Sequence, residues 1–146
     1  LDEISCAVGF TSLKKLNSTI MKRLAFLQSF SKGLIKNSMV CKPYPISEDD
    51  SPFFFPVFVK ESAISCSVYE FAKAVQHEGV GLNPKYMYVV SEWPWIQSYL
   101  GKKPVTPNAL MCRNNSFNLF VNENYGELEV NSLVNAILKV EKYYSK

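Results

Sequence analysis

The sequence predicts one small α/β domain, in which helices pack over a mainly antiparallel sheet of about three strands. The chain has 146 residues, a usual length for a single domain. Hydrophobic residues make up 47% of it and charged residues 20%, which are the proportions of a globular protein rather than a disordered one. Helical and strand-like hydrophobic patterns follow one another in the order helix, strand, helix, strand, strand, helix.

A long helix is expected at the start of the chain. Apolar residues recur there at three- and four-residue steps, at Leu13, Leu16, Ile20, Leu24 and Leu27. The helix is expected to be already under way at Asp2, which indicates a fragment that has lost a preceding segment. Its first turns are expected to be buried on two sides, because the apolar face is widened there by Ala7, Val8 and Phe10. Gly33 is the predicted end of the helix.

A loop and a strand are predicted next. The loop extends from about Lys36 to Pro52 and contains prolines and the acidic run 48–50. The run Phe-Phe-Phe-Pro-Val-Phe-Val at residues 53–59 then predicts a strand that is buried on both faces or nearly so. Because Pro56 has no N–H, this strand is expected at a sheet edge or beside a bulge.

A second helix has a clear start signal, since Ser67 and Glu70 have the spacing of a capping box. Gly79 predicts its end, and its apolar face is expected to comprise Val68, Phe71, Ala72 and Val75. Residues 80–82 suggest a short strand. The stretch 83–107 is rich in aromatic residues and proline but has no clear period, which is typical of a functional loop.

The last two elements are a strand at residues 116–121 and an amphipathic helix at residues 128–144. The apolar face of that helix is expected to comprise Leu133, Val134, Ile137, Val140 and Tyr144.

Composition and charge exclude several classes of function. The formal net charge of +3 is too small to indicate a nucleic-acid-binding surface. The longest apolar run, residues 52–59, is far shorter than the roughly 20 residues of a membrane-spanning helix. The acidic start of the chain does not resemble a signal peptide.

The four cysteines lie more than twenty residues apart, so no pair has the spacing of a zinc site. Reduced, mostly buried thiols in a cytoplasmic protein are the favoured interpretation, with two disulfides as the alternative. His77, the single histidine, is interpreted as the cation that ends a helix, and a hydrolase that uses it as a base remains a minor alternative. By themselves, the residues indicate a small domain with one aromatic loop and no complete active site.

Three stretches resemble a known family when they are taken in order. The first comprises residues 1–9, then Leu-Lys-Lys-Leu at 13–16 and Arg23, with Ser12 where the family usually has glutamine. The second is 79–88 and the third is 116–144. Together they resemble the C-terminal part of the DegT/DnrJ/EryC1/StrS aminotransferases, pyridoxal-phosphate (PLP) enzymes of fold type I that act on sugars. The run at 83–95 is more similar to the aminocyclitol and related branches, because the histidine that usually follows the tyrosine in the nucleotide-sugar branch is missing.

This resemblance implies that residues 1–146 are the small C-terminal domain of a larger enzyme. The domain that binds PLP and holds the Schiff-base lysine would lie upstream, so neither PLP nor a catalytic residue is expected on this chain alone. The implied enzyme is a cytoplasmic homodimer that transfers an amino group from an amino-acid donor to a keto-sugar or keto-cyclitol. The expected substrate contacts are Asn83, Tyr86, Tyr88, Glu92 and Trp93, with Arg113 as an anion partner. The alternative is a free-standing, non-catalytic α/β binding or interaction module.

Overall fold

The computed structural model describes residues 2–146 and confirms the α/β class. Within those residues, four strands form one antiparallel sheet in the order β1-β2-β4-β3, one strand more than expected. The strands and helices, in chain order, are α1 Glu3–Asn37, β1 Cys41–Pro43, β2 Phe54–Val59, α2 Val68–His77, β3 Leu82–Asn83, α3 Pro94–Leu100, α4 Pro107–Asn114, β4 Ser116–Phe120 and α5 Glu127–Tyr144. Single 3-10 turns occur at Glu61–Ala63 and Val90–Glu92.

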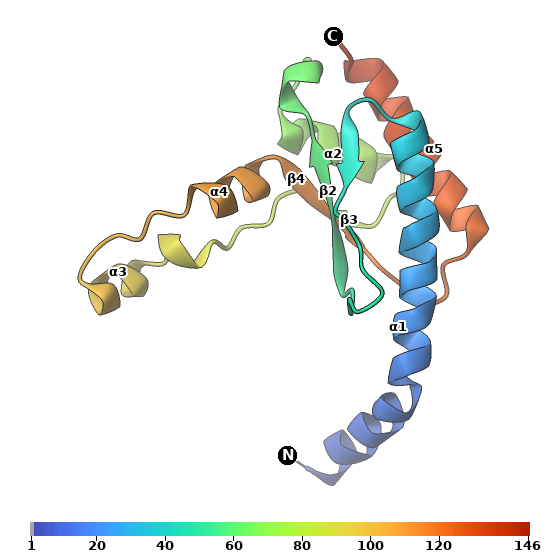
Figure 1. Ribbon diagram of the computed structural model, residues 1–146, viewed down its shortest axis with the longest axis vertical. Coiled ribbons are helices and arrows are strands. Elements are labelled where there is room, and N and C mark those ends of the chain that lie inside the picture. The colour runs from blue at the N-terminus through green and yellow to red at the C-terminus, as the bar shows by residue number, and fades with distance from the viewer. Residues whose placement is uncertain (1) are drawn as a thin grey trace.

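The two faces of the sheet have different surroundings. One face carries the alternate residues Phe55, Val57 and Val59 of β2, together with Phe117 and Leu119 of β4, and all of these are buried. Helices α1, α2 and α5 cover this face and form the hydrophobic core with it. Figure 1 shows α1 and α5 side by side, while a long connection containing α3 and α4 extends away from them.

The connection between β3 and β4, residues 84–115, is called the arm here. The expected functional loop therefore contains short helices, which the sequence analysis missed. Neither α3 nor α4 has a buried residue, so no apolar period marked them in the sequence. Each begins with a proline at its first position, where a missing N–H costs the helix nothing.

The prediction that β2 lies at a sheet edge is wrong, because β2 pairs with both β1 and β4. Pro56 is tolerated because its partner on the β1 side is Tyr44, which lies just after the last residue of β1. The backbone N–H of Tyr44 donates to the carbonyl of Pro56 at 3.0 Å, and the second hydrogen bond of an antiparallel pair would need the N–H that proline lacks. Burial on both faces was also overestimated: Phe54 is exposed, whereas Pro56 and Phe58 are half-buried.

Helix α1 differs from its prediction at both ends. It does not stop at Gly33 but continues to Asn37, and Gly33 lies where α5 approaches closely. It ends where the buried Glu141 of α5 accepts hydrogen bonds from the Ser38 hydroxyl and the Met39 N–H. Its first turns were expected to be buried, but residues 2–18 are all exposed. Nor is the helix already under way at Asp2, which is its N-cap and accepts a hydrogen bond from the N–H of Ser5.

The other elements follow their predictions closely. The capping box of Ser67 and Glu70 starts α2, Gly79 follows the helix at φ +92°, and the four predicted apolar residues are buried. Helix α5 spans the predicted range and buries Val134, Ile137 and Val140, with the other two predicted residues half-buried. No helix within residues 2–146 is long and apolar enough to cross a membrane.

All four cysteines are free, as the favoured interpretation required. The expectation that most of them are buried is wrong: Cys41 alone is buried, Cys66 is half-buried, and Cys6 and Cys112 are exposed.

Candidate functional site

The face of the sheet opposite the three packed helices is called the outer face here. A groove of about 450 Å³ lies between this outer face and the arm, and it is called the aromatic groove. Residues directly opposite one another in antiparallel strands point to the same face. Pro56 of β2 and Asn83 of β3 both lie opposite Asn118 of β4, so these three residues form a row across this outer face. The lining contributed by the sheet and its edges consists of Tyr44, Phe54, Pro56, Phe58, Ser116 and Asn118.

Aromatic rings form the wall of the groove. The rings of Phe54 and Tyr86 lie 5.9 Å apart at 30°, and those of Tyr86 and Tyr88 lie 6.3 Å apart, edge to face. Tyr86 remains 41% exposed and Tyr88 61% exposed, so both rings have free surface for a ligand. Flat aromatic surfaces bordered by polar atoms are suited to binding a ring that is apolar on its face and hydroxylated at its edge.

The polar groups of the groove come from the base of the arm. Ser91 and Thr106 share a hydrogen bond of 2.5 Å between their hydroxyls, and both line the groove. Arg113 also lines it and forms a two-pronged ion pair with Glu92. Among the described residues that line the groove, Arg113 is the only charged one.

The structure brings some of the six predicted substrate contacts together. Tyr86, Tyr88 and Arg113 line the groove, and Glu92 is joined to it through Arg113. Asn83 lies on the same sheet face, with its side-chain oxygen accepting the N–H of Lys85 at 3.2 Å. Trp93 does not line the groove: it precedes α3 and packs on Trp95 at 5.6 Å.

Several lining residues were not predicted. Phe54, Pro56 and Phe58 were assigned to the core, although they alternate with residues that are buried. No period of two was visible in the sequence, because residues 53–59 are all apolar, so the alternation of buried and more exposed residues appears only in the structure. Ser116 and Asn118 did give such a signal, because they alternate with the apolar Phe117 and Leu119 along β4.

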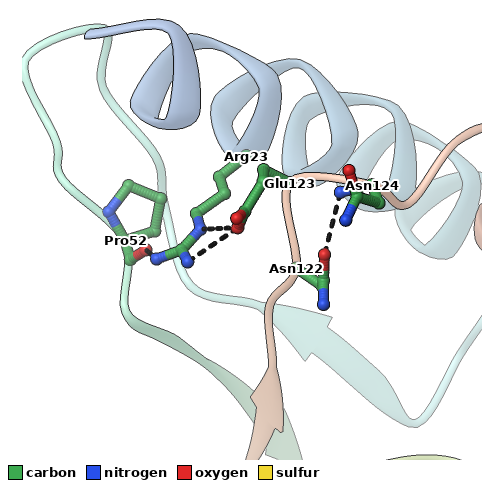
Figure 2. Close-up of polar contacts among 5 residues, drawn as sticks. All are labelled: Arg23, Pro52, Asn122, Glu123 and Asn124. Atoms are coloured by element: carbon green, nitrogen blue, oxygen red, sulfur yellow. Dashed lines mark hydrogen bonds and ion pairs between the residues drawn. The ribbon is translucent and has the colours of Figure 1, made fainter. Parts of the chain in front are cut away.

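A second polar cluster joins three segments that are distant in sequence (Figure 2). Arg23 of α1 donates to Oε2 of Glu123 from Nε at 3.2 Å and from Nη2 at 2.8 Å. Its Nη1 donates to the carbonyl of Pro52 at 3.3 Å. These bonds hold the pKa of Glu123 below its ordinary value, with the Arg23 hydrogen bond as the largest cause. The cluster fixes the β1–β2 and β4–α5 loops to α1.

No lysine of the described residues has the surroundings of a Schiff-base lysine. A Schiff-base lysine needs a sheltered site where its amine can lose a proton. None of the lysines within residues 2–146 is buried, and none lines the aromatic groove. His77 is exposed at the end of α2, in a groove lined by Glu, Lys and Tyr residues rather than by a serine or cysteine nucleophile. This arrangement gives no support to a hydrolase.

Comparisons with known proteins find a family model that matches this chain and solved structures that share its fold. The model of the DegT/DnrJ/EryC1/StrS aminotransferase family matches residues 1–138. No curated protein matches the sequence.

Three solved structures illustrate the likeness. Helicobacter pylori PseC, an aminotransferase involved in the biosynthesis of pseudoaminic acid, is 16% identical, with a TM-score of 0.78 over 98% of this chain and 38% of that one. An aminotransferase from Psychrobacter cryohalolentis is 20% identical, with a TM-score of 0.72 over 94% of this chain and 38% of that one. S. venezuelae DesV, in complex with a ketimine intermediate, is 18% identical, with a TM-score of 0.71 over 97% of this chain and 37% of that one. The chain thus spans little more than a third of these proteins.

Proposed function

This chain belongs to the DegT/DnrJ/EryC1/StrS aminotransferase family, and on that basis we propose that it is the small C-terminal domain of a PLP-dependent aminotransferase. The enzyme transfers an amino group from an amino-acid donor to a keto-sugar or a keto-cyclitol. The family match over residues 1–138 is the observation that carries this proposal. The short coverage of similar solved structures supports a further domain in the complete enzyme.

The aromatic groove is proposed to bind the acceptor. Tyr86 and Tyr88 stack on the apolar face of its ring, while Asn118, Ser91 and Thr106 hydrogen-bond its hydroxyl groups. Asn83 and Trp93 are proposed to contact the parts of the acceptor that extend beyond the groove. By holding the acceptor in one orientation and excluding water, the domain would lower the cost of bringing it to the reacting centre.

PLP and its lysine are assigned to the domain upstream, because no lysine within residues 2–146 is buried or lines the aromatic groove. When bound there, PLP supplies the electron sink for amino transfer. The chain alone is therefore expected to be inactive. The complete enzyme is proposed to be a cytoplasmic homodimer, and four free thiols are compatible with a reducing compartment.

A non-catalytic binding module is the alternative. The exposed side chains of the arm, such as Tyr99 and Val105, favour it, since they offer an apolar surface to another protein.

The proposal is tested with the complete enzyme, glutamate or glutamine as donor, and a panel of keto-sugars and keto-cyclitols. We expect Tyr86→Ala and Tyr88→Ala to raise KM for the acceptor while the half-reaction with the donor is unchanged. Tyr99→Ala is the matched control, because Tyr99 is an exposed tyrosine of the arm that does not line the groove. If none of the acceptors in the panel receives an amino group, the proposal is overturned.

A further inference from the structure

Two contacts hold the arm together at its base. They join its outgoing limb, the part that follows β3, to its returning limb, the part that leads into β4. Ser91 on the outgoing limb shares its hydrogen bond with Thr106 on the returning limb. One residue further along the outgoing limb, Glu92 pairs with Arg113 near the end of α4. Ser91, Thr106 and Arg113 also line the aromatic groove, so the same contacts that close the arm shape the mouth of the groove.

The ion pair has the geometry of a fixed contact. Nη1 of Arg113 meets one carboxylate oxygen of Glu92, and Nη2 meets the other at 3.3 Å. Nε donates to the side-chain oxygen of Asn114 at 3.2 Å, so each guanidinium nitrogen has an acceptor. The Arg113 side chain is only 16% exposed. A two-pronged pair of this kind fixes both distance and orientation.

This pairing changes what the groove can recognise. Arg113 brings the only charge among the described lining residues, and Glu92 offsets it. The remaining lining is aromatic, aliphatic, hydroxyl and amide, with the thiol of Cys112. Such a site favours a neutral hydroxylated ring over a phosphate or carboxylate, because an anion would have to displace Glu92 from Arg113.

We propose that Glu92 and Arg113 form a clasp that fixes the opening of the aromatic groove for a neutral acceptor ring. Both are positioning residues, and Arg113 is not an anchor for a substrate anion. This inference rests on the proposed function for the identity of the ligand, but the clasp itself can be measured without any ligand.

The first test uses the tryptophans of the chain. There are two, Trp93 and Trp95, and they lie one and three positions after Glu92. We expect Glu92→Gln and Arg113→Gln to lower tryptophan anisotropy and to increase quenching by acrylamide, because the outer part of the arm is released. The charge-swapped pair Glu92→Arg with Arg113→Glu should restore both signals toward the wild type. Lys139→Gln is the control, since it breaks the ion pair with Glu78, which lies outside the arm.

The second test uses acceptor kinetics in the complete enzyme. Each single variant should raise KM for a neutral acceptor about 5–30-fold with little change in kcat, and the charge swap should recover most of this loss. If Arg113 anchors an anion instead, Glu92→Gln will improve the use of an anionic acceptor and the swap will not rescue activity. That result, or single variants with wild-type fluorescence, would overturn the clasp. An inactive wild type would refute the proposed function and leave the fluorescence result to decide the clasp.

Discussion

Gly33 of α1 packs against Val134 of α5 so closely that a Cβ atom on Gly33 would lie 3.2 Å from Cγ2 of Val134. A glycine inside a helix normally weakens it. Here the missing side chain lets the two longest helices of the described chain meet face to face, with Val134 buried at their contact. The residue that a local pattern marks as a helix end is therefore a half-buried packing position between α1 and α5.

A larger side chain at Gly33 should separate the two helices. We expect Gly33→Leu to lower the free energy of unfolding by about 1–3 kcal/mol, the usual cost of overpacking a core. Thermal or urea denaturation measures this loss, and adding Val134→Ala should recover part of it.

Gly9 in the same helix is the matched control, because nothing lies within 4 Å of a Cβ placed there. Gly9→Ala should stabilise the chain by about 0.5–1 kcal/mol, the helix propensity gained. A stabilising Gly33→Leu would show that the packing at this position is looser than described.

Acid should weaken the contacts of Glu123. Its pKa is held below the ordinary 4.5 by hydrogen bonds from Arg23, so it stabilises the fold above about pH 4.5 and loses that effect as the pH falls through its lowered pKa. We expect Glu123→Gln to reduce the melting temperature at pH 7, with the difference from the wild type shrinking toward pH 3. Glu48→Gln in the exposed loop serves as the control. A difference that is constant across this range would contradict the ion pair.

Burial should protect one thiol from modification. Desolvation, and then the nearby charge of Glu141, raise the pKa of Cys41 to about 12. Very few Cys41 side chains are thiolates at pH 8, and the thiolate is the reactive form.

With iodoacetamide at pH 8, we expect Cys6 and Cys112 to be labelled first, since both are exposed. Cys41 should be labelled only after unfolding, as peptide mass spectrometry can establish. Early labelling of Cys41 would mean that β1 separates readily from the core.

The first half of α1 should make the isolated chain self-associate. Ile4, Val8, Phe10 and Leu13 are each more than 60% exposed and lie on one helix. We expect Val8→Gln with Leu13→Gln to lower the average mass in sedimentation equilibrium, whereas Tyr143→Gln, an exposed site on α5, should not. In the proposed enzyme, the upstream domain would cover these residues. A monomeric wild-type chain would refute the expectation.

The sequence predicted well those elements that are stabilised by residues close to one another in the chain. The capping box at Ser67 and the apolar faces of α2 and α5 depend on residues three or four positions apart, and these elements are found within a residue or two of their expected bounds. Helices α3 and α4 escaped prediction because they bury nothing, so their sequences carry no apolar period.

The candidate site was predicted only in part for a similar reason. Tyr86 and Tyr88 stood out because aromatic residues cluster in one long segment. Their neighbour Phe54 lies more than thirty positions earlier in the chain, and which face of β2 it occupies depends on pairing with β4. Arg113, expected as an anion partner, lines the groove, but nothing local indicated that Glu92 would pair with it.

The sequence by itself determined the α/β class, the principal helices and the family, because these depend on hydrophobic period, capping and ordered motifs along the chain. Tertiary structure alone decided that β2 lies inside the sheet, that Gly33 is a helix contact, and that Arg23 meets Glu123 one hundred residues away. Such contacts form when distant segments pack together, and their energies depend on distances in space rather than along the chain.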